Sequence, residues 1–586
     1  MKWAITRAKA AGAVRLIAEL RDCGIALTAP AARVMWARGY REPEQARRFF
    51  EPRLSDLHDP FLLAGMEAAV SRLRLAIERQ ESILLYGDYD VDGTSSIVIL
   101  KKGIELAGGR ATFHVPHRLR DGYGMRSEVV EEAAASGVSL IVSVDTGIRA
   151  NAVVRHASAL GIDVIVTDHH LPEQELPPAQ AVLNPNRPDC PYPEKNLCGA
   201  GVAFKLVDAL LARSGWTGVR RERLLDSLLK LVAIATVADV VPLTGENRVI
   251  VKRGLDGLGF VKNAGLRALL DVSGFAEGKT PNAAQVAFRI APRMNAAGRM
   301  ASATGVIEMF LTEDAARARE LAAHLHELNQ DRQQTEAEIA RAIFERCVEQ
   351  PVGDRDAALV FAGEGWHRGV VGIVASRVVE RFHRPAFVLG VENGMAQGSG
   401  RSIPAFHLLQ ALESMPELFT KFGGHKQAAG VTLPADRVEE FRERLRAYAA
   451  DRLTPADFER ELCIDAEISM AEINDQSVAD VLRLAPFGYG NPSPVFALRN
   501  VEIPVPPDVR QEKHLFARLR SAEGRILRVK AWNFAARASE LTAGTRVDVA
   551  IEFEDDPYSA ERGYAPWCST LKDVRPAGAG VSAGQD

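Results

Sequence analysis

Three carboxylates, Asp88, Asp90 and Asp92, stand at alternate positions directly after an apolar run. Carboxylates held this close repel one another unless a cation neutralises them, so the pattern favours a metal site over a solvated acidic turn. The order D-x-D-x-D-G also opens a calcium-binding EF-hand loop, but the twelfth position of that loop would be Ile99 instead of a bidentate glutamate. Because the preceding segment has the pattern of a strand and not of a helix, we exclude the EF-hand.

Acids and imidazoles recur where later apolar runs end. They are Asp145 after residues 140–144, Asp168, His169 and His170 after residues 164–167, and Asp239 within the apolar stretch 235–242. An aspartate alone in apolar surroundings costs several kcal/mol unless it is paired or bound to a metal. A lone histidine would more often be a core residue, but adjacent histidines behind an aspartate favour a ligand role. Carboxylates mixed with imidazoles suit Mn²⁺ or Mg²⁺ better than a thiolate-preferring ion.

The elements that must position these residues are strands. Five apolar runs follow one another, at 83–86, 111–115, 140–144, 164–167 and 181–183. Helical patterns, such as 95–108 and 150–160, lie between several of them. This alternation predicts an α/β fold with a parallel, doubly wound sheet. Ligands bind outside the carboxyl ends of the strands in such sheets, so we expect the acids and histidines to meet there.

The rest of the chain predicts a linker, a second lobe and a small β domain. Residues 312–348 form one helical pattern that Thr312 can cap and that ends before Pro351. A second α/β segment follows and ends near residue 455. The period then changes to two, most clearly at 547–554, which predicts a small antiparallel β-barrel. Residues 576–586 are expected to be a flexible tail.

Composition limits the classes of protein that remain. The 586 residues are 47% hydrophobic and 25% charged, a globular balance that suggests about three or four domains. The sequence contains no apolar run near the roughly 18 residues of a membrane span, and its six scattered cysteines form no C-x-x-C pair. We therefore expect a reducing, cytoplasmic setting. The net charge of −4 leaves nucleic acid open as a partner, because a local groove can be basic while the whole is not.

Longer motifs carry a resemblance to a known family. The Asp168-His169-His170 motif with the D-x-D motif is similar to the DHH phosphoesterase superfamily. Segments 291–299, 365–377, 398–402 and 423–425 resemble the RecJ family of single-stranded-DNA-specific exonucleases, over nearly the whole chain. The resemblance implies two α/β lobes, of DHH and DHHA1 type, joined by a long helix and followed by an OB-like barrel. The boundaries we expect are 1–75 for an N-terminal extension, 76–311 for the DHH domain, 312–350 for the connecting helix, 351–455 for the DHHA1 domain, 456–575 for the OB-like nucleic-acid-binding domain and 576–586 for the tail.

The resemblance also implies a centre of two Mn²⁺ or Mg²⁺ ions. The implied ligands and catalytic groups are Asp88, Asp90, Asp145, His169, His170 and Asp239, with Asp92 in direct or supporting contact. Related phosphatases carry a histidine where Tyr86 stands here, so Asp88 is expected to supply the metal contact that this histidine makes. The division among Asp88, Asp90 and Asp92 stays open. Asp168 is expected to orient a neighbouring imidazole.

Further residues are expected to bind the substrate. Arg293, Asn295 and Arg299 fall in an Ala/Gly-rich segment, read as a loop, whose donors could stabilise a phosphoryl group. The resemblance implies that Ser399, Arg401 and His425 bind the 5′-terminal phosphate of the substrate. Arg118 and Tyr123 interleave a cation with an aromatic ring, as a path for a stacked single strand would. In the barrel, residues 487–491 and the cations and aromatics around Trp532 have the content of an oligonucleotide-binding fold.

The function implied is a metal-dependent 5′-to-3′ exonuclease that degrades single-stranded DNA to 5′-mononucleotides in DNA repair and recombination. Single-stranded DNA is the expected partner, a single-strand-binding protein or a helicase is a further candidate, and no membrane is expected. One alternative is another DHH phosphoesterase that acts on short oligonucleotides or cyclic dinucleotides, although such substrates need no terminal barrel. The other alternative is a non-catalytic DNA-binding scaffold, which the complete set of acids and imidazoles disfavours.

Overall fold

The computed structural model describes residues 1–6, 10–353 and 355–578, which form two compact units. The larger unit contains residues 58–241 and 253–460, and the smaller unit contains residues 1–57, 242–252 and the chain from 461 onward. Within the described ranges, no helix combines the length and the apolar character that a membrane crossing needs.

The first sheet of the larger unit is entirely parallel, in the order β3-β2-β4-β5-β6. Its strands are β2 (Ser82–Tyr86), β3 (Ala111–His114), β4 (Val138–Val144), β5 (Asp163–Thr167) and β6 (Ala181–Leu183). Every residue of β4 from Leu140 to Val144 is buried, as expected for a strand covered on both faces. The five apolar runs predicted as strands are confirmed.

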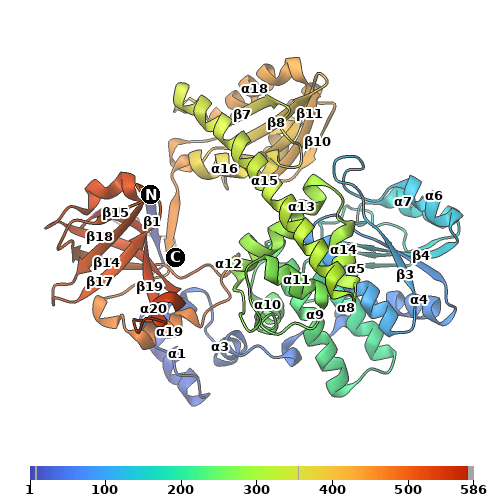
Figure 1. Ribbon diagram of the computed structural model, residues 1–586, viewed down its shortest axis with the longest axis horizontal. Helices are drawn as coiled ribbons and strands as arrows, with labels where there is room; N and C mark the ends of the chain where they lie inside the picture. Colours follow the sequence, from blue (N-terminus) through green and yellow to red (C-terminus); the bar gives the residue numbers. More distant parts are fainter. Residues whose placement is uncertain (7–9, 354, 579–586) are drawn as a thin grey trace. The chain divides into compact units, whose positions relative to one another are not determined.

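Helices cover both faces of this sheet. Those that follow or precede its strands are α4 (Met66–Glu78), α5 (Val91–Leu106), α6 (Ser127–Ala135), α7 (Asn151–Ala159), α8 (Gly199–Arg213) and α9 (Gly218–Ala238). Helices α6 and α7 pack on one face, while α5 and α8 pack against each other on the opposite face (Figure 1). The predicted doubly wound α/β fold is confirmed.

A 35-residue helix, α15 (Ala315–Glu349), joins the two sheets of the larger unit. Its first half packs against α11 (Ala264–Val272), α13 (Ala291–Met300) and α14 (Thr304–Leu311), and its second half against α16 (Val371–Phe382). Its cap differs from the one predicted. Asp314 accepts the N–H of Ala316 at 2.8 Å, whereas the Thr312 hydroxyl reaches only the N–H of Asp314, so the helix begins three residues later than the pattern indicated.

The second sheet is mixed and has the order β10-β11-β9-β8-β7. Its strands are β7 (Leu359–Glu364), β8 (Ala386–Glu392), β9 (Met395–Arg401), β10 (Lys421–Gly424) and β11 (Ala428–Pro434). Helix α16 covers one face, and α17 (Leu408–Glu413) and α18 (Val438–Ala450) cover the other.

The smaller unit is built on a closed barrel. Strands β14 (Phe496–Glu502), β18 (Arg546–Asp555), β19 (Trp567–Pro576), β17 (Ile526–Ala531) and β16 (His514–Arg520) pair in that order, and β16 pairs back with β14. The predicted barrel is therefore present, but it is not wholly antiparallel, because β17 and β19 run parallel. The predicted tail starts at the last residue of β19, and its residues 579–586 lie outside the described part of the chain.

The segment expected as a separate N-terminal extension, residues 1–75, is divided between the units. Strand β1 (Lys2–Ile5) pairs in parallel with β12 (Glu461–Ile464). Helices α1 (Ala10–Asp22), α2 (Ala29–Ala37) and α3 (Pro43–Phe50) contribute to the same apolar core as the barrel. Residues 58–75 belong to the larger unit instead. Nothing in the local pattern of residues 1–57 shows a partner that lies beyond residue 460.

A glycine sets the distance between α11 and α14. A Cβ atom on Gly265 would lie 1.8 Å from the carbonyl oxygen of Met309, which is backbone and cannot swing away. We expect Gly265→Ala to destabilise the protein by about 1–3 kcal/mol. Gly305→Ala, in α14, is the matched control, because the nearest atom to its added Cβ would be 3.9 Å away and alanine favours a helix by up to ~1 kcal/mol. Thermal unfolding of both variants checks this, and equal midpoints would contradict it.

Candidate functional site

The acidic residues converge at the carboxyl edge of the parallel sheet. Asp88 and Asp90 lie in the turn between β2 and α5, and Asp145 follows β4. The histidine pair follows β5, and Asp239 caps the carboxyl end of α9. Asp145 has a φ of +58°, a conformation that is uncommon for residues other than glycine and that recurs at functional sites.

Three groups of these side chains lie close enough to share a metal ion. Within each group, one potential ligand atom per residue lies within 4.8 Å of the others. The groups are Asp88, Asp90 and Asp145; Asp145, His169 and His170; and Asp92, His169 and Asp239. Together they contain all seven residues expected from the sequence to be metal ligands, and Asp145 and His169 each belong to two groups.

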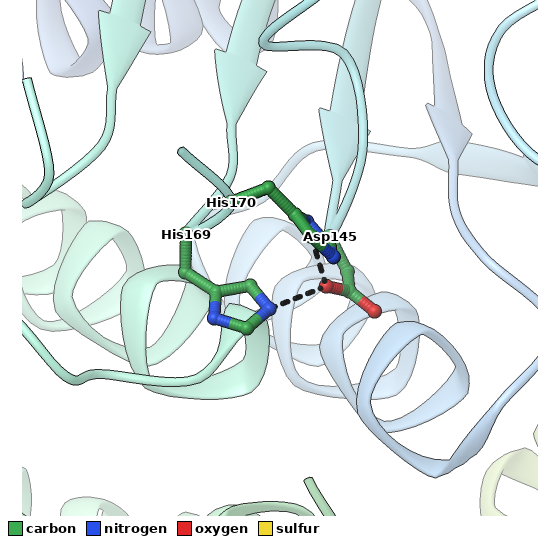
Figure 2. A group of neighbouring side chains, drawn as sticks. All are labelled: Asp145, His169 and His170. Atoms are coloured by element: carbon green, nitrogen blue, oxygen red, sulfur yellow. Dashed lines mark ion pairs between the residues drawn. The ribbon is translucent and has the colours of Figure 1, made fainter. Parts of the chain in front are cut away.

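Figure 2 shows how Asp145 faces the histidine pair. Its Oδ1 atom lies 3.1 Å from Nε2 of His169 and 3.9 Å from Nδ1 of His170. His169 also reaches the third group, because its Nε2 lies 3.7 Å from Asp92 and its Nδ1 lies 3.8 Å from Asp239. His169 therefore stands between carboxylates that come from three different elements.

Helix N-termini hold two of the carboxylates in place. Asp90 caps α5, and its Oδ1 accepts the N–H groups of Asp92 and Gly93 at 2.9 and 3.0 Å. Asp92 accepts two N–H groups from the first turn of α8, those of Gly199 at 2.5 Å and Ala200 at 2.8 Å. Partial positive charge at both helix ends stabilises these anions. The two hydrogen bonds to Asp92 suit a supporting contact to a metal, as the sequence allowed.

Burial and mutual repulsion disfavour the charged forms of several of these carboxyl groups. Burial raises the pKa of Asp88 well above its ordinary value, and the neighbouring Asp90 carboxylate raises it further. Burial also raises the pKa of Asp145, followed by repulsion from Asp92 and Asp90. The pKa of Asp239 rises to about 9 for the same reasons. Burial lowers the pKa of His169, which favours the neutral imidazole that ligates metals.

Asp168 holds the histidine pair from behind. Its Oδ1 accepts Nδ1–H of His170 at 2.7 Å and the backbone N–H of His169 at 2.7 Å, and its Oδ2 accepts the N–H of Ile148 at 2.9 Å. Burial lowers the pKa of His170, but the hydrogen bond and charge of Asp168 outweigh burial and leave it raised. This geometry agrees with the orienting role expected for Asp168.

Sequence reasoning missed two asparagines and a glycine that shape this edge. The side-chain amides of Asn184 and Asn186 donate to the backbone carbonyls of His170 and His169, at 2.8 and 2.6 Å. Both follow β6, so the same rule that singled out the other strand ends could have found them. A Cβ atom on Gly199 would lie 2.7 Å from Cβ of Asp145, so the close approach of α8 depends on glycine there.

The side chains present fit a hard divalent cation. Oδ1 of Asp88 and Oδ1 of Asp145 are buried and have no hydrogen-bond partner in the part of the chain that the structure describes. Unpaired buried carboxylate oxygens are costly unless a cation lies nearby. Carboxylates with two imidazoles are ligands for Mn²⁺ or Mg²⁺. Tyr86 takes no part, since its hydroxyl donates to the carbonyl of Gly124 at 3.3 Å.

A cluster of arginines lies next to the acidic groups. The guanidinium of Arg118 stacks 4.1 Å from the ring centroid of Tyr89, the residue between Asp88 and Asp90, and its Nε is buried without a partner among the described residues. Burial lowers the pKa of Arg299 to about 10, and repulsion from Arg118 and Arg401 adds to this. Burial and the charge of Arg118 likewise lower the pKa of Arg401. Buried cations that repel one another form a site for an anion.

The second lobe completes this anion site. A Cβ atom on Gly372, in the first turn of α16, would lie 3.3 Å from Nη2 of Arg401 and 3.4 Å from Oγ of Ser399. Serine, arginine and the helix N-terminus therefore meet at one point. A cavity of about 570 Å³ opens there, lined from the first lobe by Tyr89, Arg118 and Tyr123 and from the second by Ser399 and the glycines of β9, β10 and β11. Its size suits one nucleotide-sized ligand.

The segment that carries three of the predicted substrate residues differs from the prediction. Residues 291–300 are helix α13 and not the expected loop. Asn295 and Arg299, four residues apart, share a face of this helix: Asn295 accepts the N–H of Val91 at 3.2 Å, and Arg299 donates to the carbonyl of Gly369 at 3.0 Å. Arg293 faces away and contacts His326 of α15 at 3.2 Å, because two residues along a helix turn a side chain to the other side.

His425 follows β10 and reaches the metal side of the site. It lines a separate cavity of about 440 Å³ together with Tyr123, Thr146, Arg149 and His170. Tyr123 lines both cavities, and its hydroxyl lies 3.2 Å from Nδ1 of His170. Gly423 and Gly424 of β10, directly before His425, line the anion site together with Ser399, so the role expected for His425 beside Ser399 and Arg401 stays a prediction.

The barrel of the smaller unit carries a groove of about 930 Å³. About half of its lining is cations and aromatic rings, among them Arg510, Phe516, Arg518, Arg528, Lys530 and Trp567, and Asp508 and Asp556 also line it. Such a groove has the chemistry of a single-strand binding surface. The backbone of Gly488, Tyr489 and Gly490 packs against Pro242 and Leu243, and the nucleic-acid contact expected of residues 487–491 stays a prediction.

Comparisons with known proteins agree with this arrangement. The family models described as "DHH family, N-terminal domain", "DHHA1 domain" and "RecJ OB domain" match residues 82–236, 355–451 and 464–564. The Bacillus subtilis protein "Single-stranded-DNA-specific exonuclease RecJ" is 38% identical over 558 residues, covering 94% of this chain and 68% of that protein. The Escherichia coli protein of the same description is 38% identical and covers 82% of this chain and 85% of that protein.

The chain belongs to the RecJ family. A solved RecJ structure from Thermus thermophilus, in complex with Mn²⁺, has a TM-score of 0.82 and 32% identity, and the match covers 99% of this chain and 80% of that one. A second structure of the Thermus protein contains Mg²⁺. The ions in these RecJ structures are those that the donor set of this chain fits.

The raised carboxyl pKa values give metal binding a defined pH dependence. The pKa of Asp239 is about 9 in the folded protein and about 4 in the unfolded chain. Between these two pH values the metal-free protein takes up protons when it folds. The stability that this proton uptake contributes is lost as pH rises through that window. A divalent cation displaces those protons. We expect the rise in Tm on adding Mn²⁺ to be small at about pH 5.5 and to grow towards about pH 8.5, where saturation at 100 times Kd adds about 2.7 kcal/mol. Thermal unfolding with Mn²⁺ or a chelator measures it, and an equal rise at both pH values would contradict it.

Proposed function

We propose that this chain is a metal-dependent exonuclease that degrades single-stranded DNA from its 5′ end and releases 5′-mononucleotides. The observation that carries the proposal is the adjacency of two sites of opposite sign. The acidic groups around Asp88 and Asp90 and the cationic cavity around Arg118 share Tyr89. If a terminal phosphate binds in the cavity, the next phosphodiester bond of the strand lies at the acidic groups. Cleavage would then occur at the end of the chain.

The acidic groups and imidazoles would hold the metal ions. When bound, a pair of divalent cations lowers the pKa of a water and stabilises charge on the phosphodiester and on the leaving 3′ oxygen. Asp88, Asp145 and His169 are well placed as ligands, since Asp88 and Asp145 are buried and Asp145 lies within reach of both Asp88 and His169. Asp168 fixes the ring of His170, and the first turn of α8 fixes Asp92.

The cationic cavity would select a 5′-terminal phosphate. Arg118, Arg299 and Arg401 supply charge, and Ser399 and the first turn of α16 supply further donors. Charge-assisted hydrogen bonds of this kind are about twice as strong as neutral ones. The cavity is walled by both lobes and its volume of about 570 Å³ suits one nucleotide, which supports selectivity for single strands.

The groove of the barrel supports a substrate longer than a dinucleotide. Its cations and rings suit the backbone and bases of a single strand, and contacts to several phosphates would weaken steeply with salt. Such an activity suits DNA repair and recombination in the cytoplasm. A single-strand-binding protein or a helicase as a partner stays a prediction.

A time course on one oligonucleotide tests this function. With Mn²⁺ and a 5′-phosphorylated single strand, a 5′ label should appear at once as mononucleotide, whereas a 3′ label should appear as a ladder of shortening products. A blunt duplex of the same sequence should be cut slowly, and a chelator should stop both reactions. Early release of the 3′ label, or equal rates on single strand and duplex, would overturn the proposal.

The phosphate site makes its own prediction. Arg401→Ala should lower the rate on a 5′-phosphorylated strand by about 10- to 100-fold, the worth of a buried charge-assisted contact, and should change the rate on a 5′-hydroxyl strand much less. Arg293→Ala is the matched control, because its guanidinium contacts His326 and Arg289 instead. Comparison of kcat/KM for the two strands gives the ratio, and an unchanged ratio in Arg401→Ala would rule out this phosphate site.

A further inference from the structure

The buried stripe of helix α15 changes from apolar to polar at its middle. The buried residues are apolar from Ala318 to Leu325 and again from Ile339 to Ile343. Between these two stretches, the buried residues are Asn329, Arg332 and Glu336. Their spacing of three and four places them on the same face of the helix as the apolar residues. Helix α15 therefore carries three polar side chains where its packing elsewhere uses apolar ones.

Glu336 is held between two arginines from different helices. Its side chain is 2% exposed. Oε2 of Glu336 accepts Nη1–H of Arg332, one turn earlier on α15, and Oε1 forms an ion pair with Nε of Arg377 on α16. Nη2 of Arg332 also donates to Oδ1 of Asn329 at 2.8 Å. Glu336 thus fixes the direction of Arg332 and ties the connecting helix to α16.

Stability alone does not account for this network. The cost of removing two charges from water offsets most of their attraction, so a buried ion pair adds little net stability. The order is also the less favourable one for a helix, because the cation precedes the anion. A residue that only packed α15 against α16 would be apolar, as Ile339 and Ile343 are. The charges therefore point to a role in addition to packing.

The network borders the anion site. Burial lowers the pKa of Arg299, and the charge of Arg332 adds to the repulsion from Arg118 and Arg401. Arg332 is therefore a fourth cation in the neighbourhood of the guanidinium groups that form this site. It differs from the other three in having a buried carboxylate as its partner, so Glu336 compensates the charge that lies behind the site.

Helix α16 is fixed at two points, and the anion site lies near the first. Arg299 of α13 donates to the carbonyl of Gly369, just before α16, at 3.0 Å. Gly372, in the first turn, is the residue that approaches Ser399 and Arg401. Arg377 follows Gly372 by five residues, about 7.5 Å along the helix, and pairs with Glu336. Contacts at two points of a stiff helix determine its direction as well as its position.

We propose that Glu336 is a positioning residue for the phosphate site. By holding Arg377, it sets where the first turn of α16 stands relative to Arg299 and Arg401. By pairing with Arg332, it keeps a fourth uncompensated cation away from the bound phosphate. Glu336 acts through these groups and not by contact with the strand. The inference rests on the phosphate site of the proposed function, and a displacement of about 1 Å in such a site can cost up to about 100-fold in rate.

Glu336→Gln tests this role on the full-length protein, because glutamine keeps the shape of the side chain and removes its charge. We expect the ratio of kcat/KM on a 5′-phosphorylated strand to kcat/KM on a 5′-hydroxyl strand to fall by about tenfold. The rate on the 5′-hydroxyl strand should change much less, which a general loss of folded protein would not produce. Glu338→Gln is the matched control on the same helix, since Glu338 is exposed and only accepts from Gln334. A ratio that stays unchanged would overturn the inference. A ratio that rises would also overturn it, because Glu336 would then act only as a counter-charge.

Arg377 supplies a second variant that is less sensitive to folding, because its side chain is 51% exposed. Arg377→Ala should lower the same ratio by about threefold, as expected for a partly exposed ion pair, and Arg377→Lys should restore part of it. An unchanged ratio in Arg377→Ala would overturn the inference even if Glu336→Gln does not fold.

Arg401→Ala separates this inference from the proposed function. In the Arg401→Ala background, Glu336→Gln should cause no further loss of the ratio, because both changes act on one site. If Arg401→Ala alone leaves the ratio unchanged, the phosphate site itself is wrong. If Arg401→Ala lowers the ratio and Glu336→Gln does not, the phosphate site stands and the positioning role of Glu336 is wrong.

Discussion

Electrostatic repulsion among buried carboxylates is the constraint around which the larger unit is built. Asp88, Asp92, Asp145 and Asp239 come from separate elements, and the folded chain holds Asp88 close to Asp145 and Asp92 close to Asp239. Parallel strands make this possible, because their carboxyl ends open at one edge. The N-termini of α5 and α8 reduce the cost by donating N–H groups to Asp90 and Asp92. The repulsion that these N–H groups do not compensate favours the binding of a divalent cation.

In the neighbouring cationic site, guanidinium groups repel one another. Its guanidinium groups come from both lobes, so an anion that bridges them also draws the lobes together. Tyr89 connects the two sites, since its ring stacks on Arg118 and its backbone lies between two acids. A Cβ atom on Gly298 would lie 2.5 Å from the carbonyl of Tyr89, so α13 fixes the spacing of the sites from behind.

Sequence patterns predicted the parts of this molecule that depend on local order. The five parallel strands and the polar residues at their ends follow from short-range patterns, and so the members of the metal groups could be found. Residues 291–300 form a helix although Pro292, Asn295 and Gly298 lower the helix propensity of this run, because tertiary packing overrides local propensity. His425 and the 487–491 run depend on which distant segment they touch, and the pairing of Lys2 with Glu461 has no local signal.

The interleaved order of the two units has a consequence for synthesis on the ribosome. Strand β1 is made before its partner β12, which lies roughly 450 residues further along the chain, and at about 5–20 residues per second this is a wait of about 20–90 s. During that time the apolar faces of α1 and α2 have no barrel to cover them. These faces therefore stay uncovered while the first sheet folds.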